Sequence, residues 1–195
     1  EIMKILGRKG SHRGLELLTF SGILAFLFPK LNEFRLSCLE EEDPFADSQW
    51  PHLSVLDELR SRGAEFSDSM LLATLMSAPV ISSLRALPPS EDVGRWLHEY
   101  LEENLKPLAF PRVVRAQVNL MLLALRHMLT IQRRKRRRSL RSSPLFADAL
   151  KLLEIHCMAT NKHWSSLHHW QSPPVKPRYR RHRKKREDVT NQGRK

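Results

Sequence analysis

The sequence predicts an all-α protein, an irregular helical bundle that ends in a disordered basic C-terminal tail. Three observations support this fold class. Apolar residues recur every three or four positions along most of the chain, which is the period of an α-helix. Glycine, proline and serine residues interrupt these stretches as they do at helix ends. No stretch alternates apolar and polar residues, and the chain has no Asn-Gly or Asp-Gly hairpin turn.

The first third of the chain divides into short helices. We expect helices over residues 1–6, 11–20, 23–28, 31–38 and 53–62. Ser11 is the expected N-cap of the second helix, and Gly63 is the expected end of the last one. Residues 40–51 form a loop that Pro44 and Pro51 punctuate. This segment therefore predicts a bundle of short elements joined by tight turns.

The middle of the chain continues the helical pattern. Ser67 or Asp68 caps a helix that runs through Met76, and Pro79 bounds the next stretch. Ser90, which precedes two acidic residues, begins another helix. That helix contains Trp96, Leu97, Tyr100 and Leu101, which we expect in the core.

Two longer helices are predicted in the last third. The longest helix follows Pro111, with an apolar stripe whose members are Val114, Val118, Met121, Leu125 and Met128. Ser143 and Pro144 form the expected N-cap and first turn of the next helix, which reaches Cys157. Residues 161–170 form one more helix. The three prolines and the dense charge after Ser172 predict a disordered tail.

Charge is the strongest functional signal in the sequence. The chain has 33 Lys and Arg against 21 Asp and Glu, a net charge of +12. Residues 1–105 have a net charge of −7, whereas residues 106–195 have a net charge of +19. This asymmetry predicts a polyanionic partner for the C-terminal half, for which RNA, DNA and an anionic membrane are the candidates.

The first basic cluster lies around the end of the long helix. Its members are Arg126, Arg133, Arg134, Lys135, Arg136, Arg137, Arg138 and Arg141. No acidic residue lies between them, so like charges repel one another unless a polyanion is present. Arginine also matches phosphate through paired hydrogen bonds. The sequence therefore predicts phosphate contacts here; the alternative is a solvated helix end without a partner.

The second basic cluster lies in the tail. Its members are Lys176, Arg178, Arg180, Arg181, Arg183, Lys184, Lys185 and Arg186. We interpret this cluster as an electrostatic tether that raises the association rate and the non-specific affinity for RNA. A solubility tail and a nuclear localisation signal are the alternatives. Nearby, Trp164 and Trp170 belong either to a base-stacking platform or to a small helix that closes the core, and we favour the helix.

No catalytic or metal-binding residue is predicted. The chain contains none of the Gly-rich phosphate loops, the GxSxG elbow or the HExxH motif. Cys38 and Cys157 lie far apart in the sequence, which does not suggest a metal site and fits a reducing compartment. No apolar stretch has the ~20 residues of a membrane span. The basic stretches also lack an opposite apolar face with Trp or Phe at interfacial spacing, so we expect no membrane partner. We therefore expect no cofactor in this chain.

The order of these elements resembles the C-terminal helical part of bacterial poly(A) polymerase. That family is a branch of the class II nucleotidyltransferases, which include the tRNA CCA-adding enzymes. The proximal match places Leu15, Leu17, Leu18, Gly22, Leu24, Leu27, Phe28 and Pro29 on the family pattern. The distal match covers residues 111–155 and includes Pro144, Phe146, Ala149, Leu152 and Leu153. A helix with Trp164 and Trp170 and then a basic tail follow, as in the family.

The resemblance implies a division into a helical body over residues 1–110, a helical RNA-binding arm over residues 111–171 and a basic tail over residues 172–195. It implies that the chain holds the 3′ region of a single-stranded RNA for template-independent addition of AMP, in the bacterial cytoplasm. The catalytic head, which would use ATP and Mg²⁺, is expected upstream or in a separate polypeptide, because the chain begins inside a helix and matches none of the head's motifs. The alternatives are a stand-alone, non-catalytic RNA-binding protein and the body of a CCA-adding enzyme that acts on tRNA.

Overall fold

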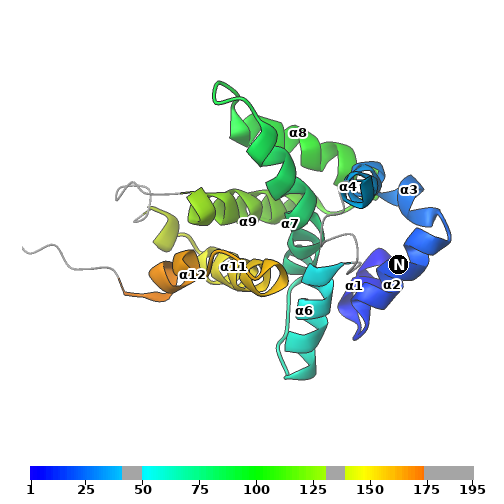
Figure 1. Ribbon diagram of the computed structural model, residues 1–195, viewed down its shortest axis with the longest axis horizontal. Coiled ribbons are helices and arrows are strands. Elements are labelled where there is room, and N and C mark those ends of the chain that lie inside the picture. Colours follow the sequence, from blue (N-terminus) through cyan, green and yellow to red (C-terminus); the bar gives the residue numbers. More distant parts are fainter. Residues whose placement is uncertain (41–49, 131–138, 174–195) are drawn as a thin grey trace, which may run out of the picture.

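Every regular element in the described part of the chain is a helix. The computed structural model describes residues 1–40, 50–130 and 139–173, and the predicted all-α fold class is confirmed there. The helices (Figure 1) are α1 (Ile2–Gly7), α2 (Ser11–Phe20), α3 (Ile23–Leu27), α4 (Pro29–Glu40), α6 (Pro51–Ser61), α7 (Asp68–Ala86), α8 (Val93–Leu105), α9 (Arg112–Thr130), α11 (Phe146–Thr160) and α12 (Trp164–Gln171). The tail predicted to be disordered lies outside the described residues from position 174 onward.

Helix α7 is the centre of the bundle. It packs against α9, and also against α1, α4, α6 and α11. Residues 69–77 are buried without interruption, because neighbouring helices cover all sides of this segment. By length and composition alone α7 could cross a membrane, and it is the one helix of the described residues that passes this test. Its burial among five other helices is the environment of a core helix.

The prediction that the chain is interrupted at Pro79 was wrong. Helix α7 continues through Pro79 to Ala86. A proline inside a helix removes one backbone hydrogen bond and costs about 3 kcal/mol. Burial of a large apolar side chain stabilises the fold by ~1.5–3 kcal/mol, and residues such as Leu72, Met76 and Val80 on this helix are fully buried. Tertiary packing therefore outweighs the local signal.

Several predicted helix starts were displaced by a few residues. Asp92 rather than Ser90 caps α8, since its Oδ1 accepts hydrogen bonds from the backbone N–H groups of Gly94 (2.9 Å) and Arg95 (3.3 Å). The helix expected from Ser143 begins at Phe146 instead, because Ser143 forms a turn in which its Oγ accepts from Leu145 N. The last helix begins at Trp164, not at residue 161.

Other local signals were correct. The Ser67 hydroxyl accepts a hydrogen bond from Met70 N and caps α7 as predicted. Gly63 has a φ of +92° and terminates α6. Ser11, in contrast, is the first residue of α2 rather than its N-cap. Its hydroxyl donates to Asp57 of α6 (3.0 Å), whose other carboxylate oxygen accepts from His12 N, so Asp57 caps α2 from a distance.

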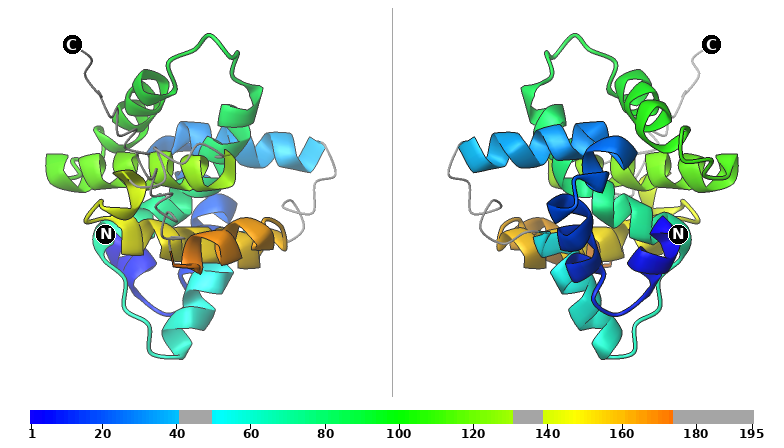
Figure 2. Two further views of the ribbon diagram at one scale, coloured as in Figure 1. Left: turned by 90° about the vertical axis from the view of Figure 1, so that its left-hand side faces the viewer. Right: turned by 90° about the vertical axis from the view of Figure 1, so that its right-hand side faces the viewer.

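One apolar core joins the predicted body and the predicted arm. Helix α9 packs on α7 and α8, and α11 packs on α6 and α7 as well as on α9. The buried cluster contains residues from both segments, including Leu72, Leu101, Met121 and Leu153. Helices α8 and α6 lie at opposite ends of the molecule in both views of Figure 2, with α9 and α11 between them. The predicted boundary at residue 110 therefore lies in the turn between α8 and α9, which pack against each other in one core.

Candidate nucleic-acid interface

Arg141 ties the start of the predicted tail to the end of the first basic cluster. Its Nη2 lies within hydrogen-bonding distance of the carbonyl oxygens of His169 (3.2 Å), Trp170 (3.0 Å) and Ser172 (2.7 Å). Its guanidinium carbon also lies 5.6 Å from the Trp170 ring centroid and 5.7 Å from that of Phe146. Arg141 therefore holds the C-terminal end of α12 against residues 139–141.

Trp170 completes this connection. Its side chain is 1% exposed, and its indole N–H donates to the Met128 carbonyl oxygen of α9 at 3.1 Å. Trp170 thus belongs to a small helix that closes the core, which was the favoured interpretation. Trp164 lies at the other end of α12, where it is 39% exposed and donates to the Asn161 side chain.

These contacts bring the described residues that flank the two basic clusters to one corner of the molecule. Met128 precedes the first undescribed basic stretch by three residues, Arg141 follows it by three, and Ser172 lies two residues before the second. Trp170 donates a hydrogen bond to Met128, and Arg141 donates one to Ser172. The described ends of α9 and α12 point to the same side in Figure 1. We call the described residues 126–130, 139–141 and 168–173 the basic corner.

The predicted phosphate-binding residues are placed as follows. Arg126 is half-buried on α9, one turn before its end, and Arg141 is engaged as described above. The other predicted members lie outside the described residues: Arg133, Arg134, Lys135, Arg136, Arg137, Arg138, Lys176, Arg178, Arg180, Arg181, Arg183, Lys184, Lys185 and Arg186.

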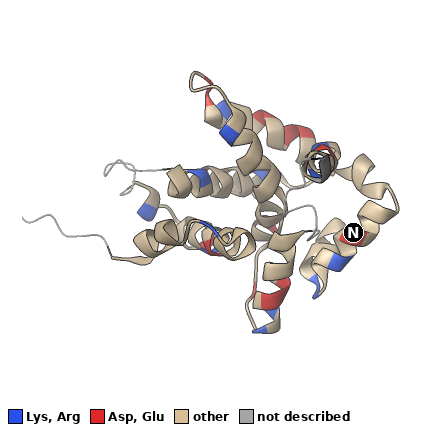
Figure 3. Cartoon of the chain, viewed as in Figure 1, with Lys and Arg blue, Asp and Glu red and all other residues tan. Residues whose placement is uncertain are grey.

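The basic corner contains no acidic side chain. Helix α9, residues 139–145 and α12 are all free of Asp and Glu. Figure 3 marks acidic residues on α8, α4, α6 and α11, and the described ends of α9 and α12 contain none. The charge asymmetry of the sequence therefore corresponds to a separation in space, which leaves the corner attractive to polyanions.

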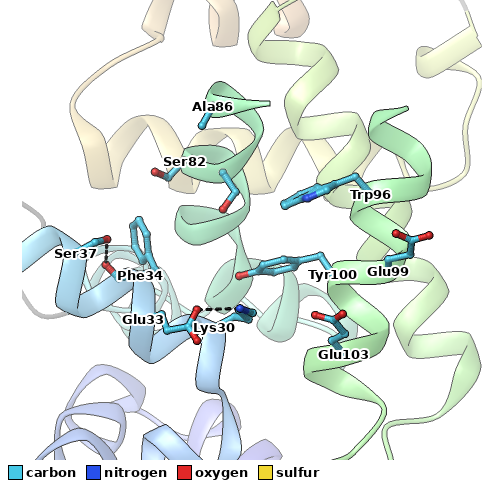
Figure 4. A pocket seen from close by; sticks show the side chains of 11 residues that line it. Lys30, Glu33, Phe34, Ser37, Ser82, Ala86, Trp96, Glu99, Tyr100 and Glu103 are labelled. Atoms are coloured by element: carbon cyan, nitrogen blue, oxygen red, sulfur yellow. Dashed lines mark hydrogen bonds and ion pairs between the residues drawn. The ribbon is translucent and has the colours of Figure 1, made fainter. Parts of the chain in front are cut away.

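A groove that the sequence did not predict lies between α4, α7 and α8. Trp96 and Tyr100 were both expected in the core, but both are only partly buried, and their rings stack at a centroid distance of 5.0 Å. The two rings face Phe34 across a groove of about 620 Å³, as Figure 4 shows. Glu33, Glu99 and Glu103 also line it. Burial raises the pKa of the Tyr100 hydroxyl, and the negative charges of Glu33 and Glu103 raise it further.

In the described residues no group of three or more His, Cys, Asp and Glu side chains could hold a metal ion. No protein-family model matches the chain, and no curated protein and no solved structure matches it. The resemblance to the poly(A) polymerase family stays a prediction from the residues that carry it.

Proposed function

We propose that the chain binds single-stranded RNA through the phosphates, and that it serves as the RNA-holding part of a polynucleotide adenylyltransferase of the poly(A) polymerase type. One observation carries the RNA-binding part of this proposal. The described residues that flank the two basic clusters, which are separated by dozens of residues in the sequence, meet at one corner through the contacts of Arg141 and Trp170. Basic segments attached at neighbouring points can contact one phosphate backbone together.

Arg141 itself acts as an anchor in this proposal. Three backbone carbonyls occupy its Nη2, so the phosphate contacts come from its neighbours in sequence. The arginines of residues 133–138 supply the paired donors that suit phosphate oxygens. The tail supplies long-range attraction that raises the association rate. The absence of acidic side chains from the corner means that RNA does not compete with internal ion pairs there.

Salt dependence of binding to a single-stranded RNA tests this proposal. If residues 133–138 contact ~6 phosphates, log K falls with log salt at a slope near −4. The variant R133Q/R134Q/R136Q/R137Q should make this slope about 3 less negative and weaken binding at low salt. A matched control, R8Q/K9Q/R13Q/R62Q, removes four exposed basic residues at α1, α2 and α6. Equal losses in both variants, or a flat salt dependence in the wild type, would refute RNA binding at this corner.

The adenylyltransferase part rests on the resemblance and needs a separate test. The native polypeptide is detected with an antibody against this region, purified and assayed for ATP-dependent extension of an RNA 3′ end. Extension by a longer polypeptide that contains this chain supports the assignment, with ATP and Mg²⁺ used by the head. A 22.7 kDa species that binds RNA without extending it would overturn that assignment and favour a non-catalytic RNA-binding protein. Competition between tRNA and unstructured RNA distinguishes the CCA-adding alternative.

A further inference from the structure

A second, smaller cavity shares Phe34, Ser37 and Ser82 with the groove beside Trp96 and Tyr100. It has a volume of about 130 Å³ and lies between α4, the end of α7, α11 and the start of α12. The polar side chains that face it include Arg85, Lys162, His156, His163 and Ser82. Among the described residues that line it, none is Asp or Glu. The cavity is therefore surrounded by hydrogen-bond donors and positive charge.

His156 provides the first indication that this cavity takes a ligand. The residue is 3% exposed, and its Nδ1 lies 3.1 Å from Nε2 of His52. Its own Nε2 is buried and has no hydrogen-bond partner among the described residues. A buried polar atom without a partner costs about 1–3 kcal/mol, and such an atom in a folded protein calls for a specific explanation.

The tautomer of His156 connects this atom to the charge of the ligand. Two neutral imidazoles that face each other share a single hydrogen. When His52 Nε2 donates that hydrogen, His156 accepts it at Nδ1 and carries its own hydrogen on Nε2. His156 then offers a buried N–H group at the cavity, which is the hydrogen-bond donor that an anion requires. The imidazole ring stays neutral in this tautomer.

The second indication is the concentration of positive charge at the cavity. Nη2 of Arg85 lies 3.4 Å from Nε2 of His163, and neither Arg85 nor Lys162 forms an ion pair with any described residue. Burial lowers the pKa of His163, and the charges of Arg85 and Lys162 lower it further. Burial likewise lowers the pKa of His156 to about 3, with further contributions from His52, His163 and Arg85.

The turn between α11 and α12 places these groups. Asn161, the C-cap of α11, and His163 both lie in the left-handed region, with φ values of 51° and 65°. Asn and His are residue types that adopt this region more readily than most. These two residues bracket Lys162 and bring His163 against Arg85 at the end of α7. Arg85 and Lys162 thus line one cavity, and neither forms an ion pair with a described residue.

We propose that this cavity binds one phosphate-sized oxyanion, held by Arg85, Lys162, His163 and the Nε2 hydrogen of His156. The volume of about 130 Å³ is large enough to admit a small tetrahedral anion. Arginine and lysine keep their positive charge at neutral pH, so a metal cation is repelled at this site. The phosphate comes either from free phosphate or from a nucleotide, and the chemistry of recognition is the same. This site does not depend on the RNA-binding proposal.

Calorimetric titration of the full chain with inorganic phosphate tests the proposal. We expect saturable binding of one phosphate, and a roughly 10- to 100-fold loss of affinity in R85Q, because a charge-assisted hydrogen bond is removed. Arg85 is exposed at a helix end, so R85Q should fold, which its helical circular dichroism checks. R62Q is the matched control, since Arg62 is also exposed at a helix end but lies outside the cavity. Absence of saturable binding, or equal affinities in R85Q and R62Q, would overturn the site.

Two further measurements place the anion and name its source. In the ¹⁵N spectrum of the imidazole rings, phosphate should shift the Nε2 resonance of His156, and no shift would contradict the proposed geometry. Tighter binding of AMP than of phosphate would support a nucleotide as the ligand, whereas binding of phosphate alone would support the free ion. The R133Q/R134Q/R136Q/R137Q variant should bind phosphate as the wild type does. An affinity that falls with these charges would instead assign phosphate to the RNA-binding segment and refute a separate site.

Discussion

The buried pair of histidines should make the stability of the fold fall steeply in mild acid. His52 and His156 are each 3% exposed and lie 3.1 Å apart between α6 and α11. Burial lowers the pKa of His52 to about 4, and burial together with its charged neighbours lowers that of His156 to about 3. In the unfolded chain both rings have a pKa near 6.5.

The magnitude follows from the difference in proton binding. Below pH 6.5 the two histidines bind protons in the unfolded chain but stay neutral in the native fold. The free energy of unfolding therefore decreases as the pH falls. Each histidine contributes a slope of about 1.4 kcal/mol per pH unit until the pH approaches its native pKa. From pH 7 to pH 5 the pair therefore costs roughly 3–4 kcal/mol, a large share of the 5–15 kcal/mol that typically stabilises a domain.

Urea unfolding in phosphate-free buffer at several values between pH 7 and pH 4.5 measures this loss. The matched control is H52Q/H156N, in which the Gln amide nitrogen can replace His52 Nε2 as the donor and the Asn oxygen can replace His156 Nδ1 as the acceptor. Neither replacement titrates in this range, while the other seven histidines remain. The control should lose much less stability on acidification. If both proteins lose the same free energy from pH 7 to pH 5, the native pair is not held neutral and the reasoning fails.

Three substitutions test other contacts of the fold by urea unfolding. Arg141→Lys should cost about 2 kcal/mol, because a lysine cannot bridge the carbonyls at the end of α12 while stacking on Trp170; unchanged stability with weaker RNA binding would show a phosphate contact instead. Asp57→Asn should cost ~1–2 kcal/mol at pH 7, because the carboxylate that caps α2 and accepts from Ser11 is lost; a variant as stable as the wild type would contradict this capping role. Gly14→Ala should cost about 1–3 kcal/mol in spite of its better helix propensity, because the added Cβ would lie 2.4 Å from Cγ2 of Ile5; Ile5→Ala in the same chain should restore part of the loss, and failure to do so would exclude the contact as the cause.

The helices that were predicted correctly are those whose ends depend on nearby residues. Ser67 accepts from an amide three residues away, and Gly63 adopts a φ that its own lack of a side chain permits. Helix α7 fails as a local prediction because the interactions that stabilise it come from five other helices. The N-terminus of α2 fails for the same reason, since its capping carboxylate belongs to Asp57, 46 residues from Ser11.

Some of the candidate sites could likewise be identified from the sequence, and others could not. A high density of arginine is visible in the sequence, so the basic clusters could be identified without a structure. The anion cavity could not, because Arg85, His156 and Lys162 come from separate elements and none has a recognisable spacing. Trp96 was assigned to the core on hydrophobicity alone, which does not distinguish a buried ring from one that walls a groove. The positive φ of His163, which belongs to the turn between α11 and α12, is likewise not visible in the sequence.

The position of the basic clusters explains how a bundle of this size tolerates so much uncompensated charge. The described part of α9 reaches Thr130, directly before residues 131–138, and α12 ends at Gln171, before the tail cluster. The carbonyl groups at a helix C-terminus have partial negative charge, and Arg141 takes up carbonyls at the end of α12 directly. This attraction weakens within about one turn of the helix end, so it acts on a cation as near as Arg141. At the end of α12 Arg141 therefore stabilises the bundle although it is a member of the uncompensated basic cluster.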